Sequence, residues 1–270
     1  MSAPPVVLSI AGSDPSGGAG IQGDLKTFSA LGAYGCAVLT ALTAQSTRGV
    51  TGTHLVPAAF VAEQLDTLVA DVRLDAVKIG MLGTAELAGA VGRFLRSSPC
   101  EVVVLDPVMV ATSGDRLLAD DAVDAVRQLL PLASIVTPNT DEAAVLLDDE
   151  VAADLPAMHR QARALLEAGA VRVLLKGGHL SGSPDAVDVY AGPEGEHELS
   201  TTRVATRNTH GTGCALSSAV AALRPQRDSW TEAVRDAKAW LTGAVAAADD
   251  LRVGSGHGPV HHLHRQWGRA

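Results

Sequence analysis

The most informative chemical pattern lies in residues 207–223, RNTHGTGCALSSAVAAL. Gly211, Thr212 and Gly213 precede an apolar helix that we expect to begin near Cys214. Free backbone N–H groups and the positive end of the helix dipole then point at one spot, which suits the charge of a phosphoryl group in transfer. Such a setting lowers the pKa of a thiol below its free value of about 8.5, so Cys214 is a candidate proton acceptor for an alcohol. The alternative is a buried structural cysteine.

Residues that could serve phosphate or a metal ion follow three further apolar runs. Lys176 ends the run 173–175 and precedes two glycines, which let a phosphate approach. Asp106 ends another run, and a carboxylate there could hold Mg²⁺ directly or through water; a turn aspartate is the alternative. Asn139 and Glu142 stand three apart at an expected helix start. Glu142 is either a second Mg²⁺ candidate or a first-turn acid behind an Asn139 N-cap.

Three other segments could bind an organic substrate. The glycine-rich run 11–28 feeds a helix with Asp24 in its first turns, where it either faces a ligand or only complements the helix dipole. Gln45 could offer a donor and an acceptor to the edge of a heterocycle, although a loop glutamine is more often solvated. Met81 stands between Gly80 and Gly83, which favours close approach by a ligand over simple core filling.

Two patterns point to chemistry that we disfavour. Residues 18–23 match G-x-G-x-x-G, the fingerprint of nicotinamide dinucleotide sites. However, five residues separate Gly12 from Gly18, and no acidic residue stands about twenty positions further on, where Gln45 lies. The His-rich run 257–264 has no carboxylate or cysteine nearby, so we expect a surface tail rather than a metal site.

The elements that must position these residues alternate between strands and helices. We expect strands at 6–12, 36–42, 76–81, 101–109, 134–139 and 171–178, with helices at 20–31, 57–73, after Thr84, at 120–130, 141–147, and from near Cys214 and Ser229. In the helix at 57–73, Phe60, Leu65 and Val72 fall on one apolar face. A hairpin is expected between 185 and 204. This order predicts a parallel sheet covered on both faces, within one domain over 1–270. Ligands of such sheets bind at the carboxyl ends of the strands.

Composition excludes several classes of protein. The 270 residues are 47% hydrophobic and carry a net charge of −9, which argues against disorder and against binding to nucleic acid or a membrane surface. Three Phe, two Tyr and three Trp are too few for a base-stacking surface. The three cysteines form no C-x-x-C pair, which favours a reducing compartment. Since no targeting or membrane-spanning segment is recognisable, we expect a cytoplasmic protein.

Taken in order, these segments resemble the ribokinase-like kinases, and closely the hydroxymethylpyrimidine/phosphomethylpyrimidine kinases of thiamine biosynthesis. The resemblance runs from VVLSIAGSDPSGGAG through KIGMLG, LDPVM, TPNTDEA, LLKGGH and NTHGTGC to SGHGPVHH. It implies a three-layer α/β/α sandwich with a mostly parallel central sheet, and often a homodimer. It also implies Mg²⁺-dependent transfer of phosphate from ATP to 4-amino-5-hydroxymethyl-2-methylpyrimidine, and then to its monophosphate.

The resemblance also implies roles for single residues. Gln45 and Asp24 match the polar pair that binds the pyrimidine, and Cys214 and Lys176 match the catalytic cysteine and the phosphate-contacting lysine. The ring is lined by Gly12, Ala19, Met81 and Val108; phosphate is held by Gly211, Thr212, Gly213 and Asn139; and the metal is held by Asp106 and Glu142. Thr112 departs from the lysine common in the family, which affects the second phosphorylation most.

Two rival functions remain open at this point. A pyridoxal kinase of the same fold would phosphorylate a similar hydroxymethyl ring. A pyrimidine-sensing module without catalysis is the other, although Lys176, Asp106, Glu142 and Cys214 together disfavour it.

Overall fold

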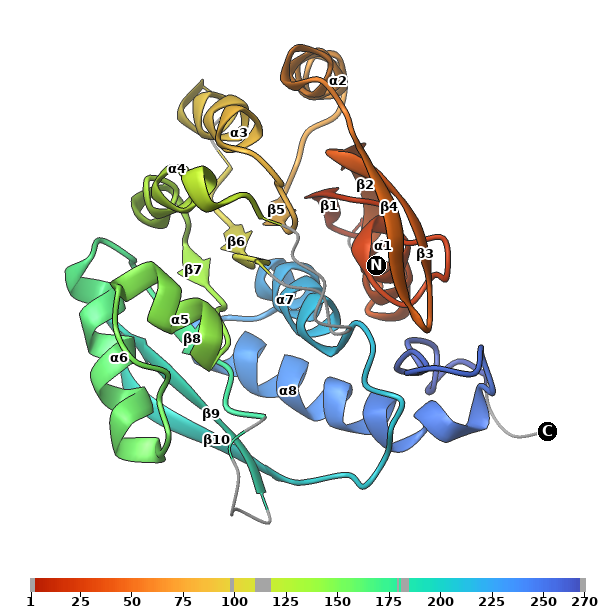
Figure 1. Ribbon diagram of the computed structural model, residues 1–270, viewed down its shortest axis with the longest axis vertical. Coiled ribbons are helices and arrows are strands. Elements are labelled where there is room, and N and C mark those ends of the chain that lie inside the picture. Colours follow the sequence, from red (N-terminus) through yellow and green to blue (C-terminus); the bar gives the residue numbers. More distant parts are fainter. Residues whose placement is uncertain (1–2, 98–99, 110–117, 179, 181–184, 268–270) are drawn as a thin grey trace.

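An eight-stranded sheet forms the centre of the protein (Figure 1). The computed structural model describes residues 3–97, 100–109, 118–178, 180 and 185–267. The strands of this sheet are β1 (Val6–Ala11), β2 (Tyr34–Leu39), β5 (Ala76–Ile79), β6 (Val103–Leu105), β7 (Ile135–Val136), β8 (Val173–Leu175), β9 (Asp185–Gly192) and β10 (Gly195–Thr202). Their order is β10-β9-β8-β7-β6-β5-β1-β2. All neighbours from β2 to β8 are parallel, whereas β9 and β10 form the expected antiparallel hairpin.

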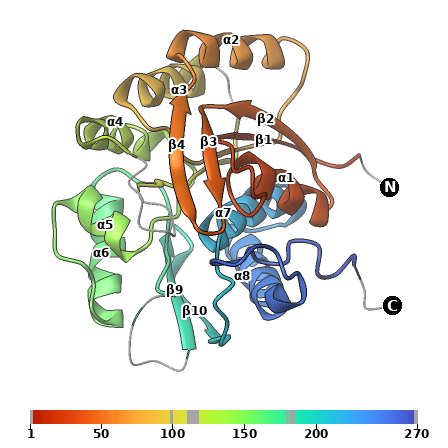
Figure 2. The same ribbon diagram turned by 45° about the vertical axis from the view of Figure 1, so that its right-hand side comes forward.

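Helices cover both faces of the sheet, which confirms the predicted layers (Figures 1 and 2). One face packs against α2 (Ala58–Val69), α3 (Ala85–Ser97), α4 (Val123–Arg127), α5 (Thr140–Leu147) and α6 (Leu155–Glu167). The other packs against α1 (Gly20–Ala30), α7 (Thr212–Leu223) and α8 (Trp230–Ala246). Each face buries its own cluster of Leu, Val, Ile and Ala side chains. The sheet therefore holds its strand ends rigidly between two apolar layers.

The strand order places a ligand crevice beside β1. The chain passes from β1 outward to β2 and then returns to β5 on the other side of β1. In open α/β sheets, such a reversal leaves a crevice at the carboxyl ends of the two diverging strands. Gly12 directly follows β1, and Met81 lies just beyond β5. These two predicted site residues therefore lie at the crevice.

The predicted strand at 36–42 is in fact two strands. The chain bends at Thr40, whose N–H donates to the carbonyl of Ala11 at 3.0 Å and whose Oγ1 donates to the carbonyl of Met81 at 2.6 Å. Beyond Thr40, β3 (Ala41–Ser46) and β4 (Gly49–Leu55) pair with each other as a separate antiparallel hairpin. The apolar run could not show this bend because both partners of Thr40 are distant in the sequence.

The helix expected at 120–130 is shorter and broken. Two 3₁₀ turns, Asp120–Ala122 and Leu130–Leu132, flank α4. Pro131 lies within the second turn and has no N–H to continue an α-helix. The start of α8 agrees with the prediction, since the Ser229 side chain accepts a hydrogen bond from the N–H of Glu232 at 3.2 Å.

The His-rich C-terminal run is not the surface tail that the sequence suggested. Val260 is fully buried, and His261 and His262 are 7% and 4% exposed. The N–H of His261 donates to the carbonyl of Ala244 near the end of α8. Burial lowers the pKa of His262 to about 3, so the ring stays neutral. The prediction was wrong because these contacts join distant parts of the chain.

Two broader features concern the described part of the chain only. Over those residues, no cluster of three or more His, Cys, Asp or Glu side chains could hold a metal ion. None of the described helices combines the length and the apolar character that a bilayer crossing requires.

Two phenylalanines give a test of the packing. Phe28 of α1 is fully buried, whereas Phe60 of α2 is 53% exposed, contrary to the prediction that it belongs to the packed face; Leu65, predicted on the same face, is buried, and so is Val61. We expect Phe28→Ala to lower the free energy of unfolding by about 3–5 kcal/mol, because a ring-sized cavity remains. Phe60→Ala is the matched control and should cost less than about 1 kcal/mol. Urea unfolding measures both, and equal losses would contradict the packing described.

Candidate active site

The turn before α7 has the geometry of an anion-binding site. Gly211 caps the helix with a φ of 79°, a left-handed conformation that favours glycine. A side chain at Gly211 would also collide with the carbonyl of Gly18, so the glycine-rich loop before α1 lies directly against this turn. The Thr212 hydroxyl donates to the carbonyl of Thr209 at 2.6 Å and fixes the turn. The first N–H groups of a helix lack intrahelical partners and can bind an anion.

Lys176 brings a positive charge to this turn. Its ammonium lies 2.8 Å from Oδ1 of Asp106 and 3.7 Å from Oε2 of Glu142. A Cβ on Gly213 would lie 3.2 Å from the ammonium, so the missing side chain at Gly213 leaves room for the lysine. Burial alone would lower the pKa of Lys176, but Asp106 and then Glu142 raise it above its ordinary value. The ammonium therefore stays charged beside the helix N-terminus.

Asp106 is the carboxylate that orders this cluster. Its Oδ1 accepts hydrogen bonds from Lys176 and from the hydroxyl of Thr137, and its Oδ2 accepts one from Ser217 at 3.0 Å. Burial would raise the pKa of Asp106, but Lys176 and Lys78 hold it below its ordinary value. An ionised carboxylate thus stands between the end of β6 and α7.

Asn139 and Glu142 form a complete capping box. Oδ1 of Asn139 accepts from the N–H of Glu142, and Oε2 of Glu142 accepts from the N–H of Asn139, each at 2.8 Å. The N-cap interpretation of this pair is therefore confirmed. Burial raises the pKa of Glu142 to about 7, Lys176 opposes this shift, and Asp106 adds to it. Glu142 thus caps α5 and faces the charged cluster as well.

A fully buried ion pair, which the sequence did not reveal, lies beneath the substrate side. Lys78 of β5 and Asp24 of α1 both have no exposed surface, and their charged atoms are 3.0 Å apart. Asp24 also accepts hydrogen bonds from Ser9 at 2.6 Å and Ser218 at 2.7 Å. The structure therefore places Asp24 below the site, in contrast to the expectation that it faces a ligand. Lys78 could have been found as the one charged residue in the apolar strand AVKI.

The other predicted ring-lining residues lie along the same edge of the sheet. A Cβ on Gly12 would lie 3.2 Å from the sulfur of Met81, so these two residues are in contact. The N–H of Ala19 donates to Oδ2 of Asp14, and the Cα of Ala19 lies next to Gly211. Val108 follows Asp106 and is partly exposed.

Gln45 comes from the β3–β4 hairpin rather than from the sheet. It is partly exposed, and its Oε1 accepts a hydrogen bond from Thr43, which also donates to the carbonyl of Ser13. Thr112, the departure from the family pattern, lies outside the described residues.

Cys214 does not have the lowered pKa that the helix N-terminus suggested. Burial raises the pKa of its thiol to about 11; Lys78 opposes the shift, and Asp106 and Asp24 add to it. The prediction of a stabilised thiolate is therefore wrong, because burial, together with the carboxylates of Asp106 and Asp24, outweighs the effect of Lys78. Cys214 is a protonated thiol at neutral pH in the ligand-free protein.

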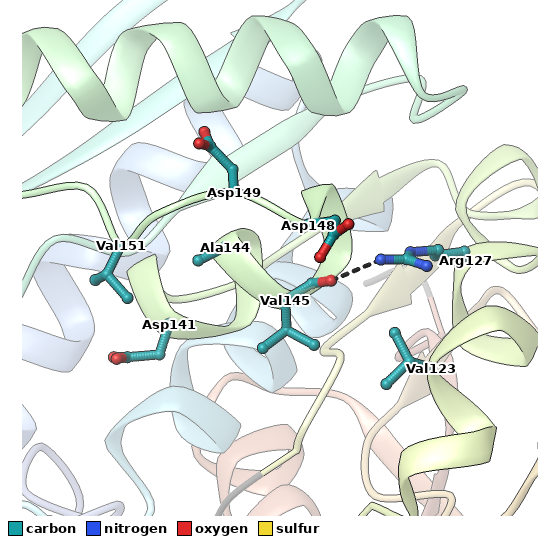
Figure 3. A pocket seen from close by; sticks show the side chains of 8 residues that line it. All are labelled: Val123, Arg127, Asp141, Ala144, Val145, Asp148, Asp149 and Val151. Carbon is teal, nitrogen blue, oxygen red and sulfur yellow. Dashed lines mark hydrogen bonds between the residues drawn. The ribbon is translucent and has the colours of Figure 1, made fainter.

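A surface hollow of about 480 Å³ lies elsewhere, between α4 and α5 (Figure 3). Arg127 stands in it and donates to the carbonyls of Val145 and Leu146 at the end of α5. None of the predicted site residues lines this hollow. We therefore place the candidate site not in this hollow but at the carboxyl ends of the strands, where the predicted site residues lie.

Comparison with known proteins agrees with this geometry. Residues 14–261 match the family model of phosphomethylpyrimidine kinase. The hydroxymethylpyrimidine/phosphomethylpyrimidine kinase of Salmonella typhimurium is 55% identical over 263 residues, covering 96% of this chain and 98% of that protein.

Two solved structures extend the comparison to the fold. Pyridoxal kinase from Staphylococcus aureus, in complex with AMP-PCP and pyridoxal, has a TM-score of 0.90 at 32% identity, over 98% of this chain and 96% of that one. Phosphomethylpyrimidine kinase from Clostridium difficile has a TM-score of 0.78 at 38% identity, over 89% and 99%. The expected ribokinase-like architecture is confirmed. With its glycine turn, buried lysines and helix N-terminus at the strand ends, the chain belongs to the phosphomethylpyrimidine kinase family.

Proposed function

We propose that this protein transfers the γ-phosphate of ATP to the hydroxymethyl group of 4-amino-5-hydroxymethyl-2-methylpyrimidine, and then phosphorylates the monophosphate to the diphosphate, in thiamine biosynthesis. The observation that carries the proposal is the meeting of the Lys176 ammonium, the Gly211 turn and the Cys214 thiol at the N-terminus of α7. The family membership and the names of the relatives support the same reaction.

The chain's own groups meet the main demands of phosphoryl transfer, which are positioning and neutralisation of charge. Lys176 and the N–H groups of the α7 turn would hold the γ-phosphate, since they present positive charge at one place. Cys214 stands beside the same turn, next to the backbone of Gly20. With its thiol protonated at neutral pH, Cys214 orients the substrate hydroxyl by hydrogen bonding.

The carboxylates of this site fit a magnesium ion. Asp106 and Glu142 share one ammonium, and burial, to which Asp106 adds, raises the pKa of Glu142 to about 7. Carboxylate oxygens are ligands that Mg²⁺ accepts, and one or two of them suffice beside substrate phosphates. We propose that Asp106 and Glu142 hold Mg²⁺, which supplies charge neutralisation to the phosphates when bound. Asn139 orients Glu142 through the capping box. We propose that it also lies on the side of the site that binds phosphate.

The substrate side suits a small heterocycle. Gly12 and Met81 touch at one wall, and Gln45 offers an amide to the ring edge. We propose that Ala19 and Val108 complete this lining. Asp24 contributes to the substrate side indirectly, because it holds the ammonium of Lys78 in place. A homodimer and a cytoplasmic location stay predictions from the sequence.

Pyridoxal phosphorylation is the second candidate, because the pyridoxal kinase of Staphylococcus aureus has a TM-score of 0.90 to this chain. An ATP-coupled assay with products resolved by mass decides between the two functions. We expect a mono- and then a diphosphorylated pyrimidine, with kcat/KM for the pyrimidine alcohol exceeding that for pyridoxal. A large preference for pyridoxal would overturn the assignment, and absence of ATP turnover with both alcohols would favour a sensing module.

The three cysteines allow a controlled test of the active-site thiol. We expect Cys214→Ala to lower kcat on the pyrimidine alcohol by about 10²-fold, because the hydroxyl loses the group that positions it. Cys100→Ala is the control, since Cys100 lies away from α7 and bonds only weakly to the carbonyl of Val102. It should leave kcat within about twofold of the wild type. If Cys214→Ala kept the wild-type kcat, Cys214 would have no part in the reaction.

The raised pKa of Cys214 gives a pH dependence. Only the thiolate reacts with iodoacetamide, so the alkylation rate of Cys214 should rise by about tenfold per pH unit above pH 7 and level off only towards pH 11. Peptide mass spectrometry follows Cys214 separately from Cys36 and Cys100. A rate that levels off near pH 7 would show that the thiolate is stabilised after all.

A further inference from the structure

The β3–β4 hairpin that carries Gln45 is an appendage to the fold. Within the described part of the chain its two strands pair only with each other, and the residues of β4 are mostly exposed. A two-stranded hairpin on its own is marginally stable in water. Contacts at the ends of the hairpin therefore help to set the position of Gln45.

The base of the hairpin is anchored to the sheet. The Thr40 hydroxyl donates to the carbonyl of Met81, and the Thr43 hydroxyl donates to the carbonyl of Ser13 at 2.9 Å. Gln45 lies beyond this anchor, after a register shift at Ala44. These bonds fix the start of the hairpin. The orientation of its far end relative to the sheet depends on other contacts.

The tip of the hairpin is held by the C-terminal segment. The N–H of His257 donates to the carbonyl of Thr47 at 2.9 Å, and the N–H of Gly256 donates to its hydroxyl at 3.2 Å. Nε of Arg48 donates to the Ser255 hydroxyl at 2.9 Å. Both views show this segment beside the lower end of the hairpin (Figures 1 and 2). Gln45 thus lies between two anchors.

The same segment is bonded to the loop that precedes the anion-binding turn. The N–H of Gly258 donates to Oδ1 of Asn208 at 2.9 Å, and the N–H of His210 donates to the carbonyl of Gly258 at 3.0 Å. The N–H of Val260 donates a hydrogen bond to the carbonyl of His210. The residue after His210 is Gly211, so only a few bonds separate the hairpin tip from the phosphate side.

We propose that residues 254–258 are a positioning element that sets the place of the β3–β4 hairpin, and with it Gln45, relative to the Gly211 turn. The inference rests on the proposed function in that Gln45 recognises the alcohol substrate. Displacing this segment should weaken recognition of the alcohol more than binding of ATP. Lys176 is held by Asp106 and the turn by the Thr212 hydroxyl, although the loop before the turn also contacts the segment.

A pair of glycine substitutions tests the proposal. A Cβ on Gly256 would collide with the carbonyl of Thr47, and the φ of Gly256 is outside the left-handed region, so Gly256→Ala acts through this collision alone. Gly52→Ala on the same hairpin is the control, since its Cβ would meet only Ala44 at 3.8 Å. We expect Gly256→Ala to raise the KM for the alcohol by about tenfold with the KM for ATP within about twofold. Gly52→Ala should change neither.

Hydrogen exchange gives a readout that needs no turnover. In folded Gly256→Ala, amides of residues 41–55 should exchange faster than in the wild type and in Gly52→Ala, while those of β1 and β5 stay protected. Failure of the wild type to phosphorylate the pyrimidine would refute the proposed function but leave this result readable. Unchanged exchange at 41–55, or a lowered melting temperature with an unchanged KM for the alcohol, would overturn the inference.

If Gly256→Ala does not fold, Thr47→Val replaces it. This change keeps the shape of the side chain and removes the hydroxyl that accepts from Gly256. The loss of one hydrogen bond should raise the KM for the alcohol by about threefold to fivefold. Thr53→Val, on the exposed strand of the same hairpin, is its control and should leave the KM unchanged. Equal KM values for the two variants would refute the proposal.

Discussion

Buried pairs of lysine and aspartate are the constraint on which the structure depends. The chain has four lysines, and three of them, Lys78, Lys176 and Lys238, pair with carboxylates that are almost fully shielded from water. A buried charge without a partner is strongly destabilising, so each pair obliges two distant elements to meet. The pairs join β5 to α1, the end of β8 to the end of β6, and α8 to β9. Asp188, which pairs with Lys238, also accepts a hydrogen bond from the N–H of Gly177 at 3.0 Å. The third pair therefore supports the backbone beside Lys176.

The balance of these charges explains the chemistry of the site. Two ammonium groups face the carboxylates of Asp24, Asp106 and Glu142, so the cluster carries excess negative charge. Burial raises the pKa of Glu142 to about 7 and that of the Cys214 thiol to about 11, and the carboxylate of Asp106 adds to both shifts. An ATP phosphate entering here would meet repulsion as well as attraction. Asp106 and Glu142 would hold a divalent cation that accompanies the phosphates, and its charge would offset this repulsion.

The sequence predicted what depends on local patterns. Alternating strands and helices, the glycine turn before α7 and the N-caps at Asn139 and Ser229 follow from neighbouring residues, and these predictions were confirmed. The Lys78–Asp24 pair, the bend at Thr40 and the buried C-terminal segment each depend on partners dozens of residues away. The pKa of Cys214 was mispredicted for the same reason, since it depends first on burial and then on carboxylates that only the folded chain brings near.

Recognition of the alcohol and chemistry on the phosphate are held by different parts of the molecule. Lys176, Asp106 and the Gly211 turn lie at the ends of strands within the rigid sheet and at the N-terminus of α7. Gln45 lies on a hairpin outside that sheet. A change in the hairpin or in its anchors can therefore alter which ring is accepted without disturbing the phosphate side.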